Sequence, residues 1–176
     1  LIGAPGARHV YVLFGSSNYG SSTLRRRLES NVGAYETAIN ALDSDSLMIL
    51  RQDDNDLDST FGSQVSTAGD VNGDGYDDVI IGATGAAPNG EAYSGSAYVV
   101  FGTPYNDAIE LSDIESGTGG FVINGAEAYD TIGSNVSAAG DFNGDGYDDV
   151  IIGAKYASPN GESSGSTYVV YGTTST

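Results

Sequence analysis

An acidic loop occurs twice in the sequence with nearly the same residues. Its first copy begins at Asp70, reads Asp-Val-Asn-Gly-Asp-Gly-Tyr-Asp-Asp and continues into Val-Ile-Ile-Gly-Ala. The second copy begins 71 residues later, at Asp141, and differs over fourteen positions only in having Phe142 where the first has Val71. Side-chain oxygens at alternate positions of a tightly curled loop can surround a hard cation. The sequence therefore predicts two metal-binding loops.

Calcium is the cation that this pattern favours, because Ca²⁺ takes six to eight oxygen ligands and tolerates irregular geometry. Loop positions 1, 3 and 5 offer side-chain oxygens, position 7 offers a backbone carbonyl and position 9 offers a further carboxylate. Gly75 and Gly146 stand at the bend, where the backbone needs an unusual φ. The predicted ligands of the two Ca²⁺ sites are Asp70, Asn72, Asp74, the Tyr76 carbonyl and Asp78, and Asp141, Asn143, Asp145, the Tyr147 carbonyl and Asp149.

Other loops begin in a similar way, and the downstream residues separate them. An EF-hand places a bidentate Glu at position 12 between two helices, whereas position 12 here is Ile81 or Ile152 in a strand-like run. A dockerin-type loop also needs an acid near that position and a following helix, and thrombospondin-type arrays would carry more Asp. A metal-free polar turn remains an alternative, because Asp, Asn and Gly dominate turns. It would leave four neighbouring carboxylates without a counter-charge.

Composition and charge exclude some functions. The chain has 176 residues, 39% of them apolar, which is enough for one ordinary domain with a core. Its net charge of −18 makes nucleic acid an improbable partner, because phosphate backbones are bound by basic surfaces. Cysteine is absent, so disulfides do not report the compartment. Loops with this ligand set are usually of the weaker, extracellular sort, and we expect a secreted or cell-surface location without membrane insertion. The sequence opens on Leu1 and reads as a mature or trimmed piece.

Repeats divide the chain into three units. Residues 1–60 form a partial first unit with an irregular insertion at 16–45, where apolar residues at helical spacing predict a small helix. Residues 61–131 form the second unit, with its loop at 70–78. Residues 132–176 form the third unit, with its loop at 141–149 and without a last strand. A long connection is expected from residue 103 to 120, between the third and fourth strands of the second unit.

The predicted fold is all-β. Four short strands per unit, joined as an antiparallel meander, make one blade of a β-propeller or a solenoid. The runs Val-Ile-Ile and Tyr-Val-Val-Phe, apolar throughout, suit strands buried on both faces. About three blades are present, whereas a closed ring takes at least about four. We therefore expect an incomplete ring or an open stack, and a chain that belongs to a larger chain or assembly. The meander also places the acidic loops at one end and the connections after the second and fourth strands at the other.

These residues resemble the FG-GAP repeats of integrin α-subunit propellers and their bacterial relatives. Phe61-Gly62, Gly82-Ala83 and the intervening acidic loop carry the resemblance, and Ile132-Gly133 stands in for Phe-Gly in the next copy. The resemblance implies calcium in the loop between blade strands 1 and 2. It also implies that ligands approach the opposite end of the blades.

Three classes of function follow. The preferred hypothesis is a non-catalytic, calcium-stabilised extracellular module for adhesion, protein interaction or assembly, with a protein or a neighbouring subunit as partner. The alternative is a carbohydrate-binding propeller that uses loop tyrosines as platforms: Tyr93, Tyr105, Tyr129 and Tyr156. An enzyme such as a lyase or hydrolase is the third class. The single His and the lack of a nucleophile motif argue against it.

Overall fold

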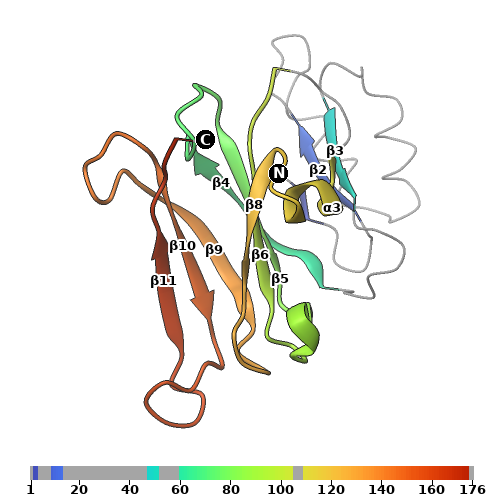
Figure 1. Cartoon of the computed structure of the whole chain (residues 1–176), viewed down its shortest axis with the longest axis vertical. Coiled ribbons are helices and arrows are strands. Elements are labelled where there is room, and N and C mark those ends of the chain that lie inside the picture. Colours follow the sequence, from blue (N-terminus) through green and yellow to red (C-terminus); the bar gives the residue numbers. More distant parts are fainter. Residues whose placement is uncertain (1, 4–8, 14–46, 52–59, 105–108, 175–176) are drawn as a thin grey trace.

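Three β-sheets make up the part of the chain that the structure describes (Figure 1). The computed structural model describes residues 2–3, 9–13, 47–51, 60–104 and 109–174. The first sheet has the strand order β1-β2-β3-β7. Its strands are β1 (Ile2–Gly3), β2 (His9–Leu13), β3 (Leu47–Arg51) and β7 (Ile109–Glu110). The predicted helical insertion at 16–45 lies outside the described residues.

The second and third sheets repeat one strand order. The second sheet runs β4 (Phe61–Gly69), β5 (Asp78–Ala83), β6 (Ser96–Val100) and β8 (Gly120–Asn124). The third sheet runs β9 (Ile132–Gly140), β10 (Asp149–Ala154) and β11 (Ser166–Val170). Both sheets are antiparallel and have the same register: Val79 pairs with Val100 in the second sheet, and the equivalent Val150 pairs with Val170 in the third. The predicted meander of repeated strands is confirmed.

A bulge explains the Phe-Gly dipeptide at the start of β4. The pairing of β4 with β5 shifts between Phe61 and Gln64, and Gly62 there has a φ of +78°. A β-bulge often needs a residue with positive φ, which glycine adopts without a Cβ clash. The bulge aims the Phe61 ring inward, where it meets the Tyr98 ring edge-on at 5.8 Å between centroids. In the third sheet Gly133 takes the same role with a φ of +83°.

The core lies on both faces of the second sheet. Every residue of β5 and β6 is buried, as their unbroken apolar runs predict. One face packs with Phe61, Tyr98 and Ile114. The other face packs against the third sheet, through residues that include Ile80, Val99 and Ile152. The second sheet is therefore sandwiched, and its neighbours hold it in place.

One close approach between the second and third sheets yields a prediction. A Cβ added to Gly82 would overlap the backbone carbonyl of Gly133. A Cβ added to the equivalent Gly153 would lie 3.5 Å from its nearest neighbours, which is an ordinary contact. Overpacking a core costs about 1–3 kcal/mol. We expect Gly82→Ala to lower the free energy of unfolding by about that amount in urea titrations, and Gly153→Ala to change it much less. Equal losses in the two variants would contradict the packing described.

The connection between β6 and β8 differs from its prediction. It contains β7 and the short helix α3 (Leu111–Glu115), which buries Leu111 and Ile114. β7 pairs in parallel with β3, with Leu50 opposite Ile109. A two-residue strand and a five-residue helix are too short for sequence periodicity to reveal them. Through β7, this connection joins the second sheet to the first.

The outer strand of the third sheet is less buried than its counterpart in the second sheet. Tyr168 in β11 is 44% exposed, whereas the equivalent Tyr98 in β6 is 3% exposed. The difference arises because β6 is covered by β8 and α3, and no equivalent of these elements lies over β11 within the described residues.

The two ends of the sheets carry different loops (Figure 1). The acidic loops, which join β4 to β5 and β9 to β10, lie together at the upper end in this view. The loops 84–95 and 155–165, and the connection 125–131, lie at the lower end. This separation of the two kinds of loop is the one predicted from the meander.

Candidate calcium loops

Both acidic loops curl through pairs of left-handed glycines. The φ angles are +73° and +89° at Gly73 and Gly75, and +79° and +94° at Gly144 and Gly146. Residues with a Cβ rarely adopt these angles. The glycines therefore let nine residues reverse direction while the acidic side chains stay on the inside of the turn.

Hydrogen bonds gather the predicted ligand side chains of the first loop into one turn. The Asp70 carboxylate accepts from the amides of Asp74 at 3.0 Å and Gly75 at 2.9 Å. Asn72 accepts from the Asp74 amide at 3.0 Å and donates through Nδ2 to the Asp74 carboxylate at 2.9 Å. Asp74 in turn accepts from the Tyr76 amide at 2.9 Å. The structure thus brings positions 1, 3 and 5 together.

The second loop repeats this arrangement. Asp141 accepts from the amides of Gly144, Asp145 and Gly146 at 2.7–2.9 Å. Asn143 accepts from the Asp145 amide at 3.0 Å and donates to its carboxylate at 2.8 Å. Nearly identical local sequence therefore gives nearly the same local hydrogen bonds in two different surroundings.

The carboxylates at position 9 have a second role that sequence reasoning missed. Asp78 is 1% exposed, and its two oxygens accept from the amides of Val71 at 2.9 Å and Gly102 at 2.7 Å. Asp149 is fully buried and accepts in the same way from Phe142 and Gly172, both at 2.9 Å. Each carboxylate clamps its loop to the end of the third strand of its sheet. If a carboxylate oxygen of Asp78 or Asp149 also bound a cation, it would do so while accepting a hydrogen bond from a backbone amide.

The chemistry of the loops fits a hard cation. Among the described residues no three His, Cys, Asp or Glu side chains form a ready-made metal cluster, and the loop oxygens point at backbone amides. The donor groups of each loop are nevertheless all oxygens, as Ca²⁺ requires. The pKa of Asp78 is raised to about 6, chiefly by burial and also by the nearby charges of Asp74 and Asp70, against the lowering effect of its two amide partners. A bound cation would offset this penalty on the ionised form.

The two loops contact each other through Asp148. Its carboxylate accepts from the Asp70 amide at 2.9 Å, and its own amide donates to the Asp70 carbonyl at 3.1 Å. The Thr173 amide donates to the Val71 carbonyl at 2.9 Å. The Tyr147 ring covers Gly73, where a Cβ would overlap it. The second loop is therefore seated on the first, and we call this contact the loop latch.

The loop latch is asymmetric. Tyr76 and Asp77 occupy the same motif positions as Tyr147 and Asp148, but they are exposed, and Tyr76 is 44% exposed. The sequence analysis assigned no partner to Asp148. The repeated Asp at position 8 was the available signal, but the sequence of one loop does not reveal which neighbour its side chain contacts.

A matched pair of variants tests the loop latch. Asp148→Ala leaves the Asp70 amide without its partner, and an unmade hydrogen bond to a charged group costs about 1.5–3 kcal/mol. We expect a loss of unfolding free energy in that range and a weaker calcium affinity of the first loop in calorimetric titration. Asp77→Ala, at the same position of the other loop, should change neither. Indistinguishable behaviour of the two variants would contradict the coupling of the loops.

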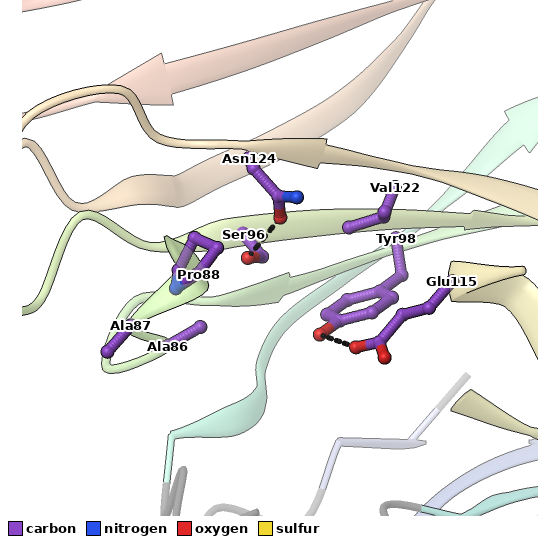
Figure 2. Close-up of a pocket in the computed structure, with 8 residues that line it drawn as sticks. All are labelled: Ala86, Ala87, Pro88, Ser96, Tyr98, Glu115, Val122 and Asn124. Carbon is purple, nitrogen blue, oxygen red and sulfur yellow. Dashed lines mark hydrogen bonds between the residues drawn. The ribbon is translucent and has the colours of Figure 1, made fainter. Parts of the chain in front are cut away.

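The predicted tyrosine platforms lie far from these loops. Tyr93, Tyr129 and Tyr156 line one groove at the opposite end of the sheets, and Tyr105 lies outside the described residues. A separate hollow of about 410 Å³ lies against β6 and β8. In Figure 2, Glu115 lies beside the Tyr98 ring and Asn124 points toward Ser96. Glu115 accepts from the Tyr98 hydroxyl at 3.3 Å, and Asn124 accepts from the Ser96 hydroxyl at 2.8 Å.

Comparisons with known proteins agree with the motif. The FG-GAP repeat family matches residues 61–100 and 133–170. The chain is similar to integrin alpha-IIb of Mus musculus, with 30% identity over 129 residues, which is 71% of the chain and 12% of that protein. It is 34% identical over 115 residues to integrin alpha pat-2 of Caenorhabditis elegans, which is 63% of the chain and 9% of that protein.

A relative with an enzyme name matches over a similar part. Phosphatidylinositol-glycan-specific phospholipase D of Dictyostelium discoideum is 28% identical over 148 residues, which is 78% of the chain and 15% of that protein. The chain thus spans less than a sixth of the length of each of these three relatives. The likeness concerns the repeated unit that they have in common with this chain.

Proposed function

Since the chain is an FG-GAP repeat protein with an integrin-alpha-like pattern, we propose that it is a non-catalytic, calcium-stabilised interaction module built from propeller blades. The observation that carries the proposal is the pairing of the two acidic loops, which share one hydrogen-bond pattern and are joined by the loop latch at one end of the sheets. A module of this kind presents binding loops on a rigid scaffold.

Bound calcium would make the two acidic loops more rigid. The ligands proposed for each ion are the side chains at positions 1, 3, 5 and 9 and the carbonyl of Tyr76 or Tyr147, and the ion supplies positive charge among four carboxylates. The chain's own residues do the rest. Asp78 and Asp149 fix each loop to its sheet, and Asp148 fixes one loop to the other. Ion binding at one end is thereby transmitted to the packing of the sheets.

A non-catalytic role is supported by the surroundings of the polar side chains. Among the described residues, the carboxylates at position 9 accept from backbone amides, and the hydroxyls of Ser96 and Tyr98 donate to Asn124 and Glu115. The acceptor for Ser96 is a neutral amide rather than a base, and Tyr98, which donates to Glu115, is only 3% exposed. The phospholipase relative motivates the opposing hypothesis, which a phosphodiester assay with a phosphatidylinositol-glycan substrate tests directly.

The proposed partner is a protein or a neighbouring subunit, outside the cell or at its surface. No described helix has the length and apolar character that crossing a membrane requires. Three sheets are fewer than a closed propeller uses, and the relatives are much longer. We therefore propose that further blades, in the same chain or another, pack beside these three.

Calorimetry, mass measurement and an activity assay together test the proposed function. We expect two Ca²⁺ ions bound per chain, no phosphodiester turnover above buffer, and a particle mass that rises with calcium as chains associate at their exposed sheet edges. Turnover that depends on calcium would favour the enzyme. Absence of calcium binding together with a constant mass would overturn the module.

A further inference from the structure

Loops from two sheets line an open groove at the end opposite the acidic loops. Its volume is about 550 Å³, which is in the range of small-ligand sites. Tyr93 comes from the loop before β6, Tyr129 from the connection between β8 and β9, and Tyr156 from the loop after β10. We call this the tyrosine groove. It lies between repeats and uses none of the residues proposed to bind calcium.

The aromatic rings of the tyrosine groove are open to solvent. Tyr93 and Tyr129 stack with their planes 16° apart and their centroids 5.8 Å apart, and they are 55% and 62% exposed. Tyr156 is 48% exposed. Large aromatic rings are usually covered, because burying them is favourable. Three exposed rings around one groove therefore indicate a surface that a ligand covers.

Backbone strain is concentrated at the same place. Non-glycine residues with positive φ in the described part of the chain number five, and four of them line the tyrosine groove: Tyr93, Tyr129, Thr131 and Ser163. Such conformations persist only where the surroundings hold them, and they cluster at binding sites. Here the amides of Tyr129, Thr131 and Ile132 donate to the carbonyls of Ala92, Tyr93 and Ser94 at 2.9–3.1 Å. The connection before β9 is thus fixed to the loop before β6, and the rings are preorganised.

The polar groups of the tyrosine groove suit hydroxyl-rich ligands. Glu127 and Asp130 provide carboxylates, and Ser158 and Ser163 provide hydroxyls. A sugar ring offers C–H groups to an aromatic face and hydroxyls to such acceptors. The carboxylates would repel an acidic sugar or a phosphate. The chemistry therefore favours neutral sugars.

A cationic side chain is the competing occupant, since carboxylates and tyrosine rings also bind cations. Two observations favour the sugar. Tyr93 and Tyr129 are nearly parallel and form a stack rather than a box around a point charge. The Lys155 ammonium already lies 5.0 Å from the centre of the Tyr156 ring, where it would repel a second cation.

We propose that the tyrosine groove between the second and third sheets binds a neutral hexose ring at the end of a glycan. This activity goes beyond the calcium-stabilised module and does not depend on the ions themselves. The stacked pair Tyr93 and Tyr129 forms the platform, and Glu127 and Asp130 accept hydrogen bonds from the sugar hydroxyls.

Substitution by asparagine tests the platform without adding strain, because asparagine tolerates left-handed φ better than most residues. The full chain, in calcium, is screened on an array of neutral, acidic and amino-sugar glycans, and the best neutral oligosaccharide is titrated by calorimetry. Tyr129→Asn should weaken binding about tenfold or more. Tyr171→Asn removes a 54% exposed tyrosine away from the groove and should leave affinity unchanged.

Other outcomes decide against the glycan. An array without neutral hits, or an affinity that Tyr129→Asn leaves intact, would overturn the proposal. So would selective binding of lysine-rich peptides that is abolished by Glu127→Gln, because that pattern belongs to a cation site. Thermal melts of both variants in calcium confirm that the sheets are folded. A variant that melts early is replaced in the comparison by Tyr93→Asn, at the other ring of the stack.

Discussion

Removing calcium is expected to lower the melting temperature by about 10–20 °C. A ligand at a hundredfold excess over its dissociation constant stabilises the folded state by about 2.7 kcal/mol per site. Two sites give about 5 kcal/mol, and a domain of this size shifts by about 2–4 °C per kcal/mol. The physical reason is the repulsion among the four carboxylates of each loop, which includes the buried Asp78. Scanning calorimetry in calcium and in EDTA measures the shift.

A paired charge-removing variant separates metal binding from loop structure. Asp74→Asn with Asp145→Asn keeps an oxygen to accept from the Tyr76 and Tyr147 amides but removes one carboxylate from each predicted site. In calcium, the double variant should melt near the wild-type chain in EDTA. In EDTA it should melt close to wild type, because the lower repulsion offsets the loss of the oxygen that accepts from Asn72 or Asn143 Nδ2. A wild-type melt that EDTA leaves unchanged would contradict calcium binding.

The sequence was sufficient to predict the strands because the strong local signals repeat. β4 and β9 begin where the predicted second and third units begin and end at the residue before each predicted acidic loop, and the Val-Ile-Ile runs predicted the buried strands. The sequence did not predict the elements that form only because another part of the chain packs against them. β7 exists because β3 offers it an edge, and α3 because its two apolar residues are covered. Similarly, β11 has the apolar sequence of β6 without the same cover.

In the candidate site, too, local contacts were predictable from the sequence and contacts between distant residues were not. Residue types and spacing predicted which side chains gather in each acidic loop, because the turn is encoded by adjacent residues and its glycines. The partners of Asp148 and Asp78 lie 78 and 24 residues away, in Asp70 and Gly102. No pattern within one loop specifies such contacts. The tyrosines were predicted as candidate platforms, but the left-handed φ values that concentrate at their groove are visible only in the fold.

The clamp at position 9 gives the second large effect. Asp78→Ala removes the acceptor of two amides, those of Val71 and Gly102, and leaving a buried donor without a partner costs about 1–3 kcal/mol. We expect a total loss of about 2–5 kcal/mol of unfolding free energy in urea titrations. The experiment is done in EDTA, so that lost calcium binding does not contribute. Asp77→Ala, at the exposed neighbouring position, is the control and should unfold like wild type.

Asp78→Asn refines this prediction, because it separates the hydrogen bonds from the charge. Asparagine keeps one oxygen acceptor and replaces the other with a donor, so one of the two amides loses its partner. It also removes a charge that is disfavoured in the metal-free loop, where burial raises the pKa of Asp78 to about 6. The loss should therefore be smaller than for alanine in EDTA. If alanine and asparagine were both as stable as wild type there, the Val71 and Gly102 amides would have other partners, and the carboxylate would serve only the ion.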